Sequence, residues 1–165
     1  MKSTIKFNFL LIITVFFSTF TLASPPSSVP TIVYAILSYA IWQKANPTIC
    51  IVNNQELTNK FNNTPTTSTN NYKIANIATT ELRNTACNAI VFSNLSPKEE
   101  QYLLNNVINF PALTISTNNF NCEEGSAFCI YKRNQQLSFK VNLESVHQSR
   151  AHIDPRVLLL AKYGE

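Results

Sequence analysis

The stretch Thr48-Ile-Cys-Ile-Val52 (TICIV) decides the fold class, because it is an unbroken apolar run rich in β-branched residues. A strand with one face in water alternates apolar and polar residues, whereas an unbroken run is typical of a strand covered on both faces, as in a parallel sheet. Similar runs follow at Cys87–Phe92 (CNAIVF) and Ala112–Ser116 (ALTIS), and Tyr72–Ile77 is expected to form a further strand. The sequence therefore predicts a largely parallel sheet.

Helices are expected between these strands. The clearest one begins with a capping box, Ser96-Pro-Lys-Glu99, and runs through Ile108. A weaker helix is expected at Gln55–Asn59, before a polar stretch at residues 62–71 that has the composition of a loop. This alternation of strands and helices indicates the α/β class.

The C-terminal part begins with a predicted hairpin. Leu137–Val141 alternates apolar and polar residues, and Cys129–Lys132 forms the other arm across a four-residue turn at residues 133–136. We therefore predict a single compact α/β domain with a mostly parallel sheet, an antiparallel C-terminal hairpin and helices on both faces.

Two helices are expected after the hairpin. Asn142 suits the N-cap of a short helix through His147, because its side-chain oxygen can accept N–H groups of the first turn. Asp154-Pro155 then marks the start of a second helix, which should end at Gly164 and bury residues 158–160 in the core.

The segment Val29–Trp42 is predicted to form the first helix and is apolar on nearly every side. A helix that only lines a core shows one apolar stripe and an opposite polar face. Either this helix is buried on most sides, or part of it, including Tyr34 and Tyr39, packs on another subunit or on a partner protein. In the second case the residues expected at a homodimer interface are Val33, Tyr34, Leu37 and Ile41.

The N-terminus has the features of a signal peptide. Lys2 and Lys6 precede an apolar core at residues 9–20 and a small-residue cleavage site, Thr21-Leu22-Ala23. We expect residues 1–23 to be removed and residues 24–165 to form the exported domain, with no membrane insertion after cleavage. The alternative is an uncleaved signal anchor.

Charge and glycine content exclude several functions. The net charge is +4, and two of these charges belong to the predicted signal peptide, so no strong field is available to bind nucleic acid or an anionic membrane. The only glycines are Gly125 and Gly164. Phosphate-binding loops and the nucleophile elbow of serine hydrolases need glycines that are absent here.

All four cysteines lie in the predicted exported part, which implies two disulfides. Three pairings are possible. We favour Cys122–Cys129, which closes a short loop around Gly125, and Cys50–Cys87, which joins two strand-like runs. A metal site is disfavoured because the chain has no C-x-x-C pair, and a redox-active pair is much rarer in exported domains than a structural one.

Catalytic groups are not evident. Ser145, His147 and Asp154 are the residue types of a hydrolase triad, but they crowd one short segment with no oxyanion-forming loop. Glu123 and Glu124 are adjacent, and adjacent side chains of an extended chain point to opposite sides. We therefore expect neither an enzyme nor a cofactor.

The order of the segments carries more information than any single motif. An apolar first helix ends in a tryptophan (Val33–Trp42), a cysteine-bearing strand follows (Thr48–Val52), and a second cysteine opens another strand (Cys87–Ser93). The later segments of the pattern are Pro111–Ser116, Phe120, Gly125, Leu137–Leu143 and Arg156–Ala161. In these features the chain resembles the YfiR family of exported bacterial proteins over nearly all of its mature length.

The resemblance implies a periplasmic α/β domain that binds the periplasmic sensory domain of an inner-membrane diguanylate cyclase and holds that enzyme inactive. Release under redox or envelope stress would raise cyclic-di-GMP and favour biofilm formation. Family disulfides suit both favoured pairings, which would stabilise the repressor, and reduction would be a route to derepression. The chain departs from the family at Gln43, where a proline is usual, and at Lys140, where a carboxylate is usual. Charge reversal at an exposed position changes partner choice more than fold.

Three residues where the last strand meets the short helix, Lys140, Asn142 and Val146, are the expected partner-binding residues. An alternative function is a periplasmic small-molecule-binding module for uptake or sensing, with a pocket lined by aromatic residues such as Tyr72, Phe92 and Phe120. A thiol-redox enzyme that uses Cys122–Cys129 is a third hypothesis.

Overall fold

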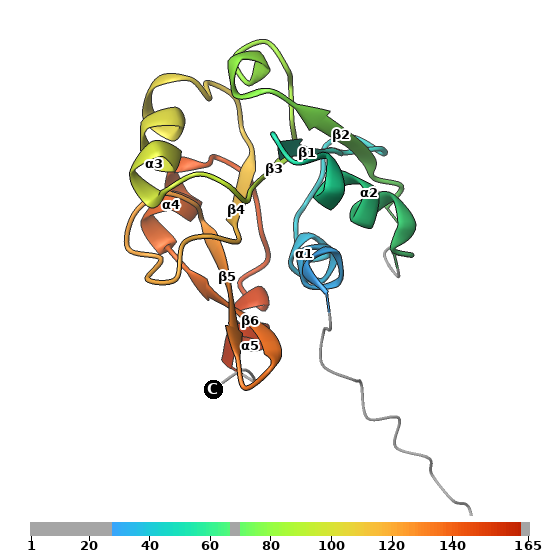
Figure 1. Ribbon diagram of the computed structural model, residues 1–165, viewed down its shortest axis with the longest axis vertical. Coiled ribbons are helices and arrows are strands. Elements are labelled where there is room, and N and C mark those ends of the chain that lie inside the picture. The colour runs from blue at the N-terminus through green and yellow to red at the C-terminus, as the bar shows by residue number, and fades with distance from the viewer. Residues whose placement is uncertain (1–27, 67–69, 163–165) are drawn as a thin grey trace, which may run out of the picture.

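The computed structural model describes residues 28–66 and 70–162 (Figure 1). The predicted signal peptide, the centre of the loop at residues 62–71 and the predicted helix end at Gly164 lie outside these ranges. Within them, six strands form one sheet in the order β2-β1-β3-β4-β5-β6, parallel from β2 to β5 and antiparallel between β5 and β6. The predicted α/β class, parallel sheet and C-terminal hairpin are confirmed.

The strands are β1 (Thr48–Val52), β2 (Lys73–Ile77), β3 (Ala89–Phe92), β4 (Leu113–Ser116), β5 (Phe128–Arg133) and β6 (Gln136–Val141). The helices are α1 (Val29–Leu37), α2 (Gln55–Asn63), α3 (Pro97–Asn106), α4 (Leu143–Gln148) and α5 (Val157–Lys162), with a 3₁₀ turn η1 (Thr79–Glu81) before β3.

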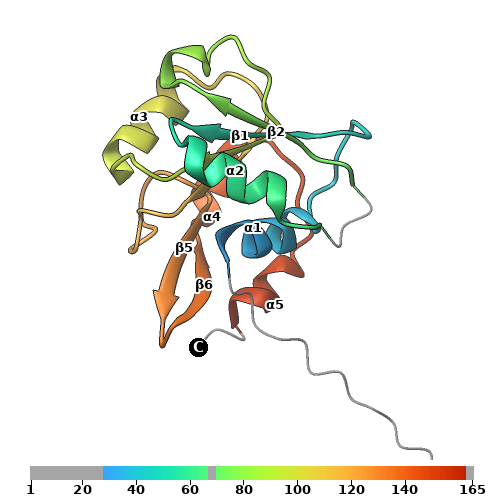
Figure 2. The same ribbon diagram turned by 45° about the vertical axis from the view of Figure 1, so that its right-hand side comes forward.

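The central strands are covered on both faces, as their unbroken apolar runs predict. In β1, Ile49 and Ile51 face one core cluster, whereas Cys50 and Val52 face the other. The first cluster is closed by α1, α2 and the start of α5, and the second by α3 and the segment after η1. Figures 1 and 2 accordingly show α1 and α2 on one side of the sheet and α3 on the other.

The first helix is shorter than predicted. Ser28 caps α1 by accepting the Thr31 N–H at 3.3 Å, and α1 ends at Leu37 instead of Trp42. The next residues turn away, and Ala40 forms an isolated antiparallel bridge with Ile153. Of the two interpretations of this helix, burial on most sides fits the structure, because nearly all of its apolar side chains are buried.

The helices α2, α3 and α4 each begin with a side-chain cap. The capping box of α3 is present: the Ser96 N–H donates to Glu99 Oε2 at 2.8 Å, and the Glu99 N–H donates to Ser96 Oγ at 3.4 Å. Asn142 caps α4 as predicted, with its Oδ1 accepting the Ser145 N–H at 3.0 Å. Asn54 caps α2 in the same way, and this helix is longer than predicted, ending at Asn63.

Two C-terminal predictions were wrong. The hairpin turn has two residues, Asn134 and Gln135, both with positive φ (46° and 66°), because Arg133 and Gln136 pair across the strands. In α5, Leu158 and Leu159 are exposed and Leu160 is only half-buried, so the three leucines are not all in the core. The helix begins at Val157, because the preceding turn is held by Asp154 accepting the Arg156 N–H at 2.9 Å.

Candidate functional site

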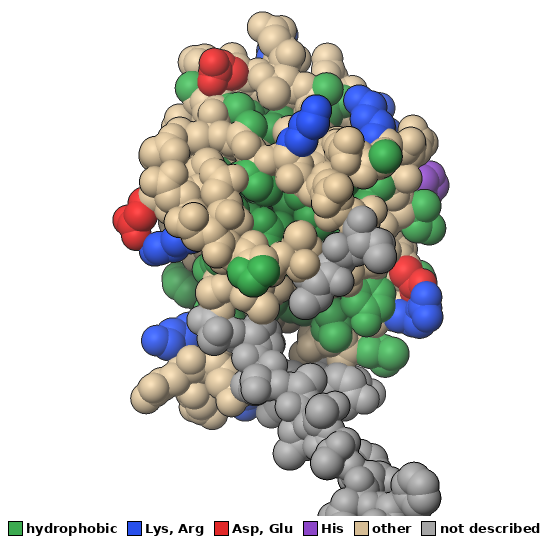
Figure 3. Space-filling model, turned by 90° about the vertical axis from the view of Figure 1, so that its right-hand side faces the viewer, with side chains coloured by type: hydrophobic (Ala, Val, Ile, Leu, Met, Phe, Trp, Pro, Cys, Tyr) green, Lys and Arg blue, Asp and Glu red, His purple; other side chains and the backbone are tan. Residues whose placement is uncertain are grey.

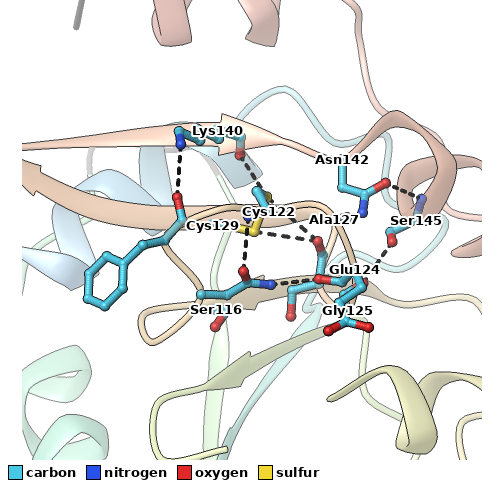
Figure 4. Close-up of a disulfide and its surroundings, with 12 residues drawn as sticks. Ser116, Cys122, Glu124, Gly125, Ala127, Cys129, Lys140, Asn142 and Ser145 are labelled. Atoms are coloured by element: carbon cyan, nitrogen blue, oxygen red, sulfur yellow. Dashed lines mark hydrogen bonds between the residues drawn. A yellow bond between two sulfur atoms is a disulfide. The ribbon is translucent and has the colours of Figure 1, made fainter. Parts of the chain in front are cut away.

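Both favoured disulfide pairings are present in the structure. Cys50–Cys87 links β1 to the segment entering β3 across 37 residues, and both of its residues are buried. Cys122–Cys129 spans only seven residues and joins β5 to the segment before it (Figure 4). We call this segment, residues 117–127 between β4 and β5, the disulfide loop.

The disulfide loop is ordered by its own asparagine as well as by the sulfur bridge. Asn119 is buried, and its Oδ1 accepts the Cys122 N–H at 3.0 Å while its Nδ2 donates to the Glu124 carbonyl oxygen at 2.6 Å. These two bonds hold both halves of the loop and fix Cys122 at a positive φ of 61°.

Gly125 ties the loop to two helices. Its N–H donates to Gln101 Oε1 of α3 at 2.7 Å, and its carbonyl oxygen accepts the Ser145 hydroxyl of α4 at 2.7 Å (Figure 4). Its φ is +85°, and an added Cβ would lie 2.9 Å from Glu100 Oε2. Glycine is therefore required here both for the backbone conformation and for the close approach to α3.

A buried carboxylate lies beneath the loop. Glu100 of α3 is fully buried; its Oε1 accepts the Ser116 hydroxyl at 2.5 Å, and its Oε2 accepts the Ser126 hydroxyl at 2.8 Å and the Ser126 N–H at 3.2 Å. Burial raises the pKa of this carboxyl group, while hydrogen bonds from Ser116, Ser126 and Asn119 act in the opposite direction. Sequence reasoning missed Glu100.

Of the predicted partner-binding residues, Lys140 is the exposed one. It lies opposite Cys129 in the antiparallel register, and its Nζ donates to the Phe120 carbonyl oxygen at 2.9 Å. Asn142 and Val146 are half-buried, because Asn142 caps α4 and Val146 packs against the first core cluster. These two residues therefore position α4 beside the loop and present little surface to a partner.

Two apolar side chains in or beside the loop were not predicted to be exposed. Phe120 is 61% exposed and Leu143 is 65% exposed. Their backbones are placed by the loop and the adjoining strand end, because Phe120 accepts from Lys140 and the neighbouring Asn142 N–H donates to the Ala127 carbonyl at 2.9 Å. We call Phe120, Lys140 and Leu143 together the disulfide surface. The available signal was an aromatic residue inside a polar asparagine-rich stretch, Thr117–Asn121.

The residues predicted to form a homodimer interface mostly face the core. Val33, Tyr34 and Leu37 are buried within the domain, where Tyr34 stacks on Tyr72 with ring centroids 5.5 Å apart. They are thus not available to a second copy in this fold. Ile41 is 66% exposed, but it lies beyond the end of α1. The homodimer remains a prediction that needs contacts other than Val33, Tyr34 and Leu37.

The aromatic residues predicted to line a ligand pocket are not brought together. Tyr72 packs with Tyr34 in the first core cluster, Phe92 is buried in the second, and Phe120 is exposed. A cavity of about 210 Å³ lies elsewhere, beside Cys87. Its lining residues include Trp42, Lys44, Phe110, Arg150 and His152.

Among the described residues, no hydrogen bond joins the residue types of a hydrolase triad. The Ser145 hydroxyl is engaged by the Gly125 carbonyl, His147 is exposed, and Asp154 pairs with Arg156. Among the described residues no cluster of His, Cys, Asp or Glu could hold a metal ion. No helix in the described ranges is long and apolar enough to cross a membrane. The face shown in Figure 3 carries scattered charged side chains and no continuous charged patch.

The family comparison covers all of this architecture. A family model described as YfiR/HmsC-like matches residues 28–162. That range includes every helix and strand from α1 to α5, both disulfides and the disulfide surface. The chain therefore belongs to the YfiR/HmsC-like family.

Proposed function

We propose that this protein is a periplasmic regulator that binds the periplasmic sensory domain of an inner-membrane diguanylate cyclase and represses that enzyme, which lowers cyclic-di-GMP and biofilm formation. Membership of the YfiR/HmsC-like family supports a role in regulating diguanylate cyclase signalling. The N-terminal sequence supports export, and two disulfides suit an oxidising compartment. Repression by direct contact is our proposal.

The observation that carries the proposal is the disulfide surface. Phe120 and Leu143 are large apolar side chains held in water by a short, heavily hydrogen-bonded loop and the helix that packs on it. Apolar anchors on a fixed backbone are typical of protein-binding sites, because little conformational entropy is lost when a partner covers them. Lys140, whose Nζ donates to the Phe120 carbonyl oxygen, supplies a charge that can select the partner.

Three variants of matched exposure test this assignment. Phe120→Asp and Leu143→Asp alter the disulfide surface, and Tyr102→Asp alters a 63% exposed side chain of α3 that is not part of it. Binding is measured by isothermal titration calorimetry against the purified periplasmic domain of an inner-membrane diguanylate cyclase, which we expect to be encoded beside this gene. We expect the first two to weaken binding about tenfold or more, and Tyr102→Asp to bind like the wild type.

The possible results distinguish an error in the binding surface from an error in the proposed function. Equal binding by all three variants would move the interface elsewhere. No binding by the wild-type protein, together with unchanged cyclic-di-GMP after deletion of the gene, would contradict the repressor function itself.

A second candidate function, binding of a small anionic molecule, is favoured by the cavity beside Cys87. Lys44 and Arg150 line it, and the Nε1 group of the lining residue Trp42 is buried with no hydrogen-bond partner among the described residues. Small carboxylates and phosphates are screened by thermal shift. A stabilisation that is lost in Arg150→Ala and kept in the surface control Lys132→Ala, with no protein partner bound, would favour this function.

A further inference from the structure

The disulfide loop has more anchors than its sulfur bridge. Glu100 binds Ser126 through two hydrogen bonds, and Gly125 is bound on one side by Gln101 and on the other by Ser145. None of these bonds involves Cys122 or Cys129. They come from α3 and α4, which are held in the fold by their own packing and caps.

Glu100 is the central anchor. It is fully buried, and its carboxylate joins the end of β4, through Ser116, to the loop, through Ser126. The loop backbone approaches it so closely that residue 125 has no room for a Cβ. A carboxyl group buried this deeply, whether ionised or neutral, must keep its hydrogen bonds, because an unpaired buried polar group is strongly destabilising. The loop is therefore held in place by the need to satisfy Glu100.

We propose that Glu100 is the positioning residue of the disulfide loop: its buried carboxyl group holds the loop in place independently of the Cys122–Cys129 bond, so that reduction of this bond alone leaves the disulfide surface intact. Reduction by a dithiol breaks the Sγ–Sγ bond, gives two thiols by addition of two electrons and two protons, and oxidises the reductant to its own disulfide. If the proposed function holds, reduction of Cys122–Cys129 alone would not release the cyclase, because the Glu100 contacts would also have to be lost.

The surroundings of Glu100 make this anchor sensitive to pH. The groups that bind it are uncharged: Ser116 on β4, and Ser126 and Asn119 in the loop. The carboxylates beside Glu100 on α3 and in the loop, Glu99, Glu123 and Glu124, are exposed, and Lys140 donates to Phe120 instead. Burial raises the pKa of Glu100 when the loop packs on it, so the neutral carboxyl group favours the packed loop. This stabilisation of the packed loop is fully present below the ordinary pKa of 4.5 and is lost as the pH rises through the raised pKa.

Hydrogen exchange tests the proposal without any partner, so its failure is distinct from failure of the repressor function. Exchange of residues 119–127 is followed by mass spectrometry in the oxidised full chain, in Cys122→Ala/Cys129→Ala, in Glu100→Ala, and in the three changes combined. Glu124→Gln is the control for removal of a loop carboxylate. We expect the double variant to keep loop protection within a few-fold of wild type, and the combined variant to lose about tenfold or more.

Two further measurements distinguish positioning from a general loss of fold. Glu100→Gln, which keeps an acceptor for Ser126 and can donate to Ser116, should restore protection in the double-variant background. Loop protection in Glu100→Gln should also be independent of pH, whereas wild-type protection should rise on acidification from neutral pH toward 4.5.

If the variant that combines Glu100→Ala with the two cysteine changes does not fold, Ser126→Ala in the double-variant background replaces it, and a smaller loss of protection is expected. Loop protection lost fully in Cys122→Ala/Cys129→Ala, or unchanged by loss of Glu100 in that background, would overturn the proposal.

Discussion

Removal of the two disulfides should affect global stability unequally. Cys50–Cys87 closes a segment that contains α2, β2 and η1, with a sequence separation of 37, whereas Cys122–Cys129 closes a separation of seven. If a disulfide acts mainly by restricting the unfolded chain, the longer loop contributes about 4 kcal/mol and the shorter about 2.5 kcal/mol to the free energy of unfolding. Cys50→Ala/Cys87→Ala should therefore be the more destabilising change.

Urea unfolding of the oxidised protein and of the two double variants measures this difference. Alanine is the suitable replacement, because these residues are buried and a serine hydroxyl would lack a partner. The m-value must also be compared, since it reports changes in the unfolded ensemble. A larger loss for Cys122→Ala/Cys129→Ala than for Cys50→Ala/Cys87→Ala would refute the chain-entropy reasoning and would make the disulfide loop a main determinant of global stability.

Four further changes test individual features. Gln135→Gly should raise the free energy of unfolding by about 1 kcal/mol, because glycine adopts the φ of 66° in the hairpin turn without a Cβ penalty; unchanged stability in urea would contradict the turn assignment. Gly125→Ala should lower it by about 1–2 kcal/mol or more, since its Cβ would meet Glu100, and wild-type stability would show that the loop can move aside. Relative to Glu100→Gln, wild-type protein should lose stability as the pH rises above 4.5, because the neutral carboxyl of raised pKa is the stabilising form; parallel stability curves would contradict this sign. Ile41→Asp should convert the expected homodimer to a monomer in sedimentation velocity, and a dimer that persists would have its interface elsewhere.

The parallel sheet was predictable from the sequence because its strands are buried on both faces. That burial leaves unbroken apolar runs such as Thr48–Val52, in which alternate residues serve the two core clusters. The starts of α3 and α4 were predictable for a different reason: Ser96 and Asn142 satisfy N–H groups only a few residues away, so the signal is local.

Features that depend on distant residues were not predictable. Glu100 follows a capping box, where an acidic residue is expected at the surface near the positive end of the helix. Its burial depends on Ser116 and Ser126, which are 16 and 26 residues away. The end of α1 has no glycine or proline to mark it, and it is set by the bridge between Ala40 and Ile153.

The exposure of the predicted partner-binding residues was predictable only in part, for a similar reason. The alternation in β6 correctly placed Lys140 in solvent, but the short helix after it was predicted without knowing which side packs on the core. Val146 takes the core side and Leu143 the exposed side. Three consecutive leucines in α5 gave a related error, since neighbouring residues on a helix cannot all face the same core.

Diguanylate cyclase activity measured against added protein tests the central claim most directly. The detergent-solubilised cyclase that we expect to be encoded beside this gene is titrated with the mature chain, and cyclic-di-GMP production is followed. We expect activity to fall to a saturating minimum, and Leu143→Asp to require about tenfold more protein for the same effect while Tyr102→Asp matches the wild type. Activity that stays constant at every concentration of folded, oxidised protein would contradict the repressor function.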